Sequence, residues 1–149
     1  MSNTPSKPKR DPHNYLPRVG YGFDTHKFAP AASEDNYITL GAVKIPFEKS
    51  MVAHSDGDVV LHAVTDAILG AIGEGDIGMY FPPTDLEWKN ADSTIFLEKA
   101  RNLMTERGGF ISNIDITIVT ERPKLMLYKR AMQKKIAELL FIEDNQVSV

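Results

Sequence analysis

Histidine and aspartate gather in two short stretches of this chain, residues 24–26 and 54–62. The chain has four histidines and no cysteine, so a transition-metal site in it would use imidazole nitrogen and carboxylate oxygen. Asp24 and His26 are two positions apart, which places both side chains on one face of a strand. Together they could chelate one ion, although an Asp-x-His pair taken alone is more often two exposed strand residues.

His62 is the third candidate ligand, in the middle of a segment that is apolar at helical spacing. A lone histidine there is usually a core residue that hydrogen-bonds to a neighbour. Asp58 and Asp66, however, lie four residues before and after it on the same helix face. A carboxylate beside a ligating imidazole fixes its tautomer, so we expect both aspartates to support His62. Three ligands, Asp24, His26 and His62, would leave one tetrahedral position open, as in a catalytic zinc site.

His54 directly precedes the expected start of this helix. Ser55 is the predicted N-cap, and Asp58, three residues on, would complete a capping box. Helix N-termini favour anions, so His54 and Ser55 could contact one. A plain loop position for His54 fits the spacing equally well.

The composition is that of an ordinary globular domain, with 42% hydrophobic residues, 25% charged residues and a formal net charge of −3. The sequence offers no basic stripe for nucleic acid and no apolar run of the roughly 18 residues that a membrane span needs. The lack of cysteine excludes a disulfide scaffold. No apolar leader is visible at the N-terminus, and we expect a cytoplasmic protein without nucleic-acid or membrane partners.

Residues 1–17 are rich in Pro, Lys, Ser and Asn, which is typical of a disordered extension, and we expect one domain over residues 18–149. Gly20 and Gly22 alternate along the first expected strand, which indicates close backbone packing or a ligand on that face. The apolar periodicity predicts strands at 18–25, 37–45, 114–118 and 146–149, and helices at 55–72, from 92 or 93 to the glycines at 108 and 109, and from 123 onward.

Several motifs make a family resemblance recognisable. They are RVGYGFDTHKF at 18–28, AHSDGDVVLHAVTDAILGAIGEGDIGMYFPPTD at 53–85, ADS at 91–93 and NIDITIVTERPKL at 113–125. In this order they resemble the 2-C-methyl-D-erythritol 2,4-cyclodiphosphate synthases. The resemblance covers nearly everything from Arg18 to Val149, and its longest block is highly specific.

The resemblance implies conversion of 4-diphosphocytidyl-2-C-methyl-D-erythritol 2-phosphate to the 2,4-cyclodiphosphate with release of CMP, in non-mevalonate isoprenoid precursor biosynthesis. The family's zinc ligands fall on Asp24, His26 and His62, and its catalytic histidine falls on His54. The implied cofactors are Zn²⁺ and a second ion, Mg²⁺ or Mn²⁺. The implied substrate-binding residues are Asp24, His26, His54, Ser55, Asp76, Ile77, Gly78, Phe81, Pro82, Pro83, Thr84, Asp85, Thr120, Lys124, Leu125 and Met126.

The resemblance also implies an α+β fold, a two-layer sandwich with a mixed β-sheet and helices on one face. It implies a homotrimer with active sites between subunits, in which Lys124 reaches the site from the adjacent chain. The family pattern continues past the position of Val149 with a segment that contains threonine, glutamate and arginine. We therefore expect severely impaired or absent turnover from a chain that stops there.

Two other functions fit the same residues. A metal-dependent phosphohydrolase could use the same Asp/His site, and it would incorporate solvent oxygen into its product. An inactive truncated form that only binds cytidine nucleotides would bind CDP without turnover.

Overall fold

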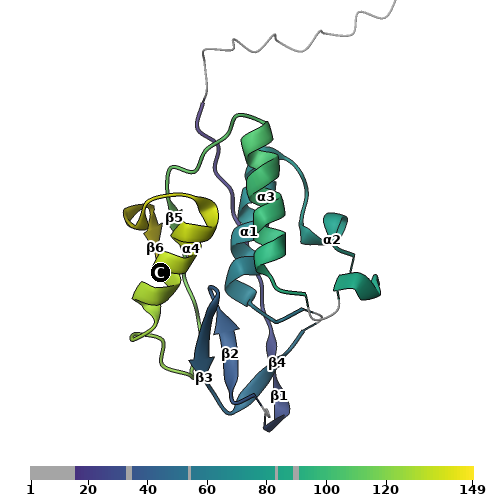
Figure 1. The fold of residues 1–149 in the computed structure, drawn as a ribbon, viewed down its shortest axis with the longest axis vertical. Coiled ribbons are helices and arrows are strands. Elements are labelled where there is room, and N and C mark those ends of the chain that lie inside the picture. Colours follow the sequence, from purple (N-terminus) through teal and green to yellow (C-terminus); the bar gives the residue numbers. More distant parts are fainter. Residues whose placement is uncertain (1–15, 33–34, 54, 83, 89–90) are drawn as a thin grey trace, which may run out of the picture.

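The computed structural model describes residues 16–32, 35–53, 55–82, 84–88 and 91–149 (Figure 1). Its helices are α1 (Val59–Ile72), α2 (Ile77–Tyr80), α3 (Thr94–Glu106) and α4 (Lys129–Leu140), with 3-10 turns η1 (Leu86–Trp88) and η2 (Asp144–Gln146). Its strands are β1 (Lys27–Ala32), β2 (Tyr37–Leu40), β3 (Val43–Pro46), β4 (Lys49–Val52), β5 (Ile114–Asp115) and β6 (Val147–Ser148). The predicted extension, residues 1–17, falls almost entirely outside the described residues.

Helices α1 and α3 lie side by side at the centre of the molecule (Figure 1). Helix α1 is apolar around much of its circumference, so neighbouring elements cover it on several sides. Gly73 ends α1 in a left-handed conformation, with φ of 75°, that a glycine adopts without steric cost. The hydrophobic core extends from these helices to the β2–β3 hairpin and α4. Its largest fully buried apolar side chains are Ile45, Leu61, Leu69, Leu97, Met132 and Ile136.

Within the described residues, the strands form three two-stranded sheets rather than one mixed sheet. Strands β1 and β4 pair antiparallel, β2 and β3 pair antiparallel, and β5 and β6 pair parallel. The predicted α+β class is therefore correct, but the described residues do not form the expected single mixed sheet. The reason lies in the first expected strand, which packs on a helix instead of pairing.

Residues 18–25 run in an extended conformation along α1 without strand pairing, and the first strand begins later, at Lys27 (Figure 1). The two alternating glycines make this possible. A Cβ atom on Gly20 would lie 1.8 Å from the Ala67 carbonyl oxygen, and one on Gly22 would lie 1.8 Å from the Ala63 carbonyl oxygen. The predicted close backbone packing is thus observed, and its partner is the backbone of α1.

The strand predicted over 37–45 is a hairpin, β2 and β3, with a two-residue turn at Gly41 and Ala42. Both turn residues have positive φ, 56° and 60°, as the twist of a tight hairpin requires. Alanine rarely adopts this conformation, which is why the sequence pattern predicts an uninterrupted strand. The carboxylate of Asp58 stabilises the turn, because it accepts hydrogen bonds from both turn N–H groups, at 2.8 and 2.7 Å.

Asp58 is the N-cap of α1, so the prediction that Ser55 caps this helix is wrong. Its fully buried carboxylate accepts hydrogen bonds from Val60 N, at 3.2 Å, and Leu61 N, at 3.1 Å, as well as from the hairpin turn. Burial raises the pKa of Asp58, while the donated N–H groups act in the opposite direction. One side chain thus joins the start of α1 to the β2–β3 turn.

Replacing Asp58 with alanine should lower the free energy of unfolding by about 3 kcal/mol or more, because buried N–H donors lose their acceptor. Urea denaturation measures this. Asp58→Asn keeps the size but turns an amide NH₂ toward the same donors, so it should also destabilise. Asp115→Ala, an exposed aspartate on β5, is the control and should change little. A loss below about 1 kcal/mol in Asp58→Ala would contradict the assigned role.

The C-terminal elements begin later or end earlier than expected. Helix α4 begins at Lys129 rather than at Pro123, because the preceding residues form turns in which the Leu125 carbonyl oxygen accepts from Tyr128 N and Lys129 N. Strand β5 covers only part of the predicted 114–118, although Ile116 N still donates to Ser148 O at 2.9 Å. Among the described residues, no helix combines the length and the apolar character needed to cross a bilayer.

Candidate metal centre and substrate site

Asp24, His26 and His62 form a cluster in which one potential ligand atom from each lies within 4.8 Å of the others. Nδ1 of His62 lies 2.9 Å from Oδ2 of Asp24, and Nδ1 of His26 lies 3.3 Å from the same oxygen. The two imidazole ring centres are 5.2 Å apart. The structure thus brings together the three residues that sequence spacing selected.

Two elements position this cluster. His62 projects from the first turn of α1, where its backbone N–H donates to the Asp58 carbonyl oxygen at 3.0 Å. Asp24 and His26 follow the glycines whose backbone lies directly on α1. The contact of Gly22 with α1 therefore holds both residues beside His62.

The donor set fits a divalent transition metal. Nδ1 of His26 is buried without a hydrogen-bond partner in the described part of the chain, which is costly for a polar atom unless another species completes its surroundings. Two imidazole nitrogens and one carboxylate oxygen are ligands that Zn²⁺ accepts, with a further position open. These three residues could accordingly hold one such ion.

Burial lowers the pKa of His26, so its ring stays neutral at pH 7, which is the form that binds a metal. Burial alone would raise the pKa of Asp24. The hydrogen bond with the His62 ring and the nearby His26 outweigh burial and lower this pKa, so the carboxyl group is ionised. Both side chains are thus in the protonation state of metal ligands.

The other edge of the His62 ring contacts two serines. Nε2 of His62 lies 2.8 Å from Ser93 Oγ and 3.1 Å from Ser55 Oγ. The Ser93 hydroxyl also donates to a carboxylate oxygen of Asp56, and Ser93 N donates to the other at 3.2 Å. Ser55, which is predicted to contact phosphate, therefore lies beside the metal-cluster residue His62.

The expected carboxylate partners of His62 have other roles. Asp58 caps α1, as described above. Asp66 accepts a hydrogen bond from Ile77 N at 2.9 Å and so ties the start of α2 to α1. The prediction that both hydrogen-bond to His62 is wrong, because each carboxylate instead satisfies a backbone N–H group that has no intrahelical partner. The sequence marks residue 93 only as a possible helix start, and residue spacing carries no signal that Ser93 contacts His62.

The predicted substrate residues Asp76, Ile77 and Gly78 form the N-terminal end of α2. Asp76 is its N-cap, and its carboxylate accepts from Met79 N at 3.2 Å. Phe81 ends this short helix. Its ring lies 4.8 Å from that of Trp88 and 4.6 Å from that of Phe96, measured between centroids.

Phe96 in turn lies 5.7 Å from the His62 ring, so aromatic contacts connect the segment after α2 with the metal cluster. Pro82, Thr84 and Asp85 follow in this segment, where Asp85 Oδ1 accepts from Glu87 N at 3.0 Å. Two further predicted residues, His54 and Pro83, lie outside the described residues.

The sequence model of the YgbB family matches residues 17–149. The chain belongs to the YgbB family. Among its curated relatives, the 2-C-methyl-D-erythritol 2,4-cyclodiphosphate synthase of Xanthomonas axonopodis pv. citri is 48% identical over 132 residues, which cover 89% of this chain and 77% of the relative. The bifunctional enzyme IspD/IspF of Caulobacter vibrioides is 49% identical over 89% of this chain, and this chain spans only 34% of that relative's length.

One solved structure, "IspF (Plasmodium falciparum) CDP complex", has the same fold. It superposes with a TM-score of 0.74 at 38% identity, and the match covers 89% of this chain and 78% of that one. The likeness confirms the α+β fold of this YgbB member.

The remaining predicted residues of this YgbB chain, Thr120, Lys124, Leu125 and Met126, lie in the loop between β5 and α4. Figure 1 places this loop beside β3 and α4, whereas α2 lies beyond α1 and α3 on the opposite side of the molecule. Thr120 Oγ1 donates to the Arg122 carbonyl oxygen at 2.5 Å, and Lys124 and Met126 are exposed. One chain does not bring this loop and α2 together.

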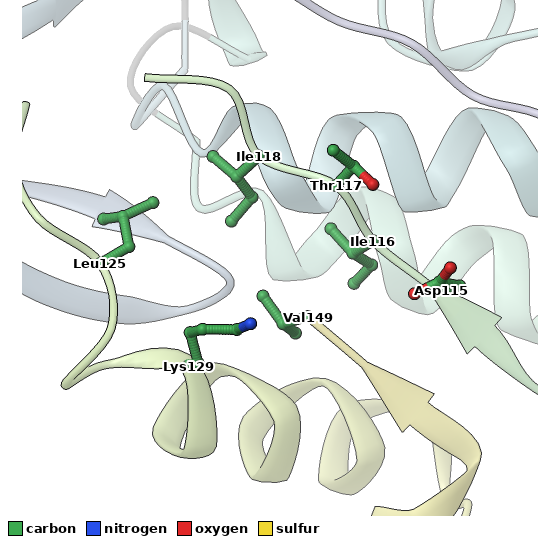
Figure 2. A pocket seen from close by; sticks show the side chains of 7 residues that line it. All are labelled: Asp115, Ile116, Thr117, Ile118, Leu125, Lys129 and Val149. Carbon is green, nitrogen blue, oxygen red and sulfur yellow. The ribbon is translucent and has the colours of Figure 1, made fainter. Parts of the chain in front are cut away.

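Leu125 lines a cavity of about 310 Å³ between α4 and residues 115–118. Figure 2 shows Ile116 and Ile118 facing Leu125 and Val149 across this space, with Lys129 reaching into it from α4. The residues of the metal cluster do not line the cavity, so it is separate from the candidate metal centre.

Proposed function

We propose that this chain is a 2-C-methyl-D-erythritol 2,4-cyclodiphosphate synthase of the non-mevalonate route to isoprenoid precursors. Its substrate is 4-diphosphocytidyl-2-C-methyl-D-erythritol 2-phosphate. The observation that carries the proposal is the convergence of Asp24, His26 and His62 in a YgbB-family chain. The CDP named in the Plasmodium falciparum complex supports a substrate that carries a cytidine diphosphate group.

In this reaction an oxygen of the 2-phosphate forms a bond to the β-phosphorus of the diphosphate, and the bond from that phosphorus to the CMP oxygen breaks. Both reacting groups belong to one molecule, so the protein's main task is to hold it folded with the two phosphates in line. Transfer within the substrate uses no water. Such a reaction therefore requires separate segments of the protein to bind the two ends of the substrate.

The residues of this chain divide between these tasks. Asp24, His26 and His62 hold a zinc ion, which when bound supplies Lewis-acid stabilisation of phosphate oxygens. His54 and Ser55 would contact phosphate, and a second ion, Mg²⁺ or Mn²⁺, would offset the negative charge of the diphosphate. The methylerythritol end lies against the N-terminal end of α2 and residues 81–85. The loop at 120–126 holds the cytidine.

The working assembly that we propose is a homotrimer with active sites between its chains. The position of the 120–126 loop, away from α2 within one chain, supports a site completed by a neighbouring copy. Val19, Tyr21 and Phe23, which are 92%, 83% and 71% exposed, form an apolar row on the side of their segment turned away from α1. Exposed apolar side chains in a row support an association surface there.

Product analysis in water labelled with oxygen-18 tests the proposed reaction. The zinc- and magnesium-loaded protein should convert the substrate, at whatever rate, to CMP and a cyclic diphosphate that contains no solvent oxygen. Phosphorus NMR and mass spectrometry identify both products. A linear phosphate product that carries solvent oxygen would instead establish a phosphohydrolase. Tight CDP binding with no conversion of the substrate would leave only a nucleotide-binding module.

A further inference from the structure

Ser93 occupies the N-cap position of α3 but does not cap it. Its backbone is helical, with φ of −63° and ψ of −13°, and its side chain accepts no hydrogen bond from the first turn. Asp92 partly substitutes, since its Oδ1 accepts from Thr94 N at 2.9 Å. A serine at this position usually stabilises its helix by about 1 kcal/mol through the cap. The fully buried hydroxyl of Ser93 is used elsewhere, between His62 and Asp56.

The chemistry of the three groups fixes the direction of these hydrogen bonds. An ionised carboxylate only accepts, so the single hydroxyl hydrogen of Ser93 goes to Asp56. Oγ of Ser93 is then an acceptor, and Nε2 of His62, 2.8 Å away, must carry the hydrogen that it accepts. With hydrogen held on Nε2, Nδ1 is the nitrogen that gives its lone pair to a metal ion, once the ion displaces the hydrogen that Nδ1 shares with Asp24 Oδ2 at 2.9 Å. That nitrogen faces Asp24 and His26.

Asp56 is itself held in place, which makes it a fixed end for this chain of hydrogen bonds. Its carboxylate accepts from Ser93 N and from Asp58 N, both at 3.2 Å, and its own N–H donates to the Ala91 carbonyl oxygen at 3.1 Å. These contacts join the loop before α1 to the loop before α3. Backbone hydrogen bonds to Asp56, together with its negative charge, therefore set the orientation of the Ser93 hydroxyl.

We infer that Ser93 and Asp56 are positioning residues that keep hydrogen on Nε2 of His62, so that Nδ1 is the nitrogen offered to the metal, and that they thereby set the metal affinity of the site. The inference rests on the metal centre in the proposed function and adds two residues to it. Hydrogen-bond partners of this kind typically change metal affinity by roughly 10–100-fold. Ser55, 3.1 Å from Nε2, is the longer and weaker alternative acceptor.

The test is zinc affinity at pH 7, measured by competition with a chromophoric chelator. Ser93→Ala should bind zinc about 10–100-fold more weakly than the unchanged protein. Thr65→Val is the matched control, because Thr65 is also fully buried on α1 and its hydroxyl donates only to the Leu61 carbonyl oxygen, at 2.7 Å. It removes a buried hydroxyl without touching His62, so its zinc affinity should stay unchanged.

The variant Asp56→Asn tests the same inference independently. The amide NH₂ can donate to Ser93 Oγ, which turns the serine hydroxyl toward Nε2 of His62 and favours the tautomer with hydrogen on Nδ1. Nitrogen-15 NMR of the metal-free proteins should show hydrogen on Nε2 of His62 in the unchanged protein and its loss from Nε2 in the variant, and zinc affinity should fall as in Ser93→Ala. A purely structural role for Ser93 would not move the tautomer.

The outcomes separate this inference from the proposed function. If the unchanged protein binds no zinc, the metal centre itself is wrong. If it binds zinc and both Asp56→Asn and a folded Ser93→Ala keep full affinity, the inference is overturned while the metal centre stands. Should Ser93→Ala fail to fold, Asp56→Asn alone decides between these results.

Discussion

Replacing His62 with alanine should abolish stoichiometric zinc binding. The variant loses one of three protein ligands, and the remaining Asp24 and His26 are only two ligands, two positions apart on one extended segment. Two ligands bind a transition metal far more weakly than three, because the lost contact is replaced by water. Elemental analysis after dialysis against metal-free buffer measures the zinc that remains per chain. Catalytic turnover, where present, should disappear with it.

Two variants separate this effect from general damage. His62→Gln keeps most of the volume against Phe96 and a polar tip toward Ser93, so it should stay folded yet still lose zinc. His13→Ala removes the one histidine outside the two metal-binding stretches and should retain all of its zinc. Stoichiometric zinc in a folded His62→Ala protein would show that the ligand assignment is wrong.

Replacing Gly22 with alanine should dismantle the metal centre without touching any ligand. The added Cβ would lie 1.8 Å from the Ala63 carbonyl oxygen and 2.8 Å from Ala67 N, which are backbone atoms of α1 and cannot turn aside. The extended segment must therefore lift away from α1 and carry Asp24 and His26 with it. We expect a loss of about 3 kcal/mol in unfolding free energy, as for severe overpacking, together with loss of zinc binding.

Gly70→Ala is the matched control for this prediction. Gly70 is in α1 and faces the same extended segment, but a Cβ there would lie 4.0 Å from the nearest atom, Tyr21 O. Alanine is a better helix former than glycine, so this variant should be stabilised by up to about 1 kcal/mol and keep its zinc. Gly22→Ala with full zinc occupancy and unchanged stability would mean that the segment does not depend on this close contact.

The metal ligands could be predicted because their spacing and their surroundings agree. Asp24 and His26 share one face of an extended segment, and His62 is the lone histidine of an apolar helix. The partners of His62 could not be predicted in this way. Helical spacing favours Asp58 and Asp66 as these partners. Asp58, however, is at the start of α1, where its carboxylate accepts from unpaired backbone N–H groups. The carboxylate of Asp66 accepts from Ile77 N instead. Ser93 comes from another helix, and no local pattern marks it.

The fold shows the same division between local and long-range information. The long helices α1 and α3 were predicted because their apolar periodicity and glycine ends are local. Gly20 and Gly22 predicted a close approach but not its partner, because only tertiary structure decides between a strand and a helix backbone. The turn at Gly41 was missed, since a buried carboxylate distant in the sequence stabilises it.

The claim on which the proposed function depends is that Asp24, His26 and His62 hold one metal ion. Anomalous diffraction at the zinc absorption edge, from crystals grown with Zn²⁺, tests it most directly. We expect one strong peak within about 2.0–2.2 Å of Asp24 Oδ2 and of Nδ1 of His26 and His62, with Nε2 of His62 still hydrogen-bonded to Ser93. A peak elsewhere on the chain, with Asp24 still hydrogen-bonded to His62, would contradict it.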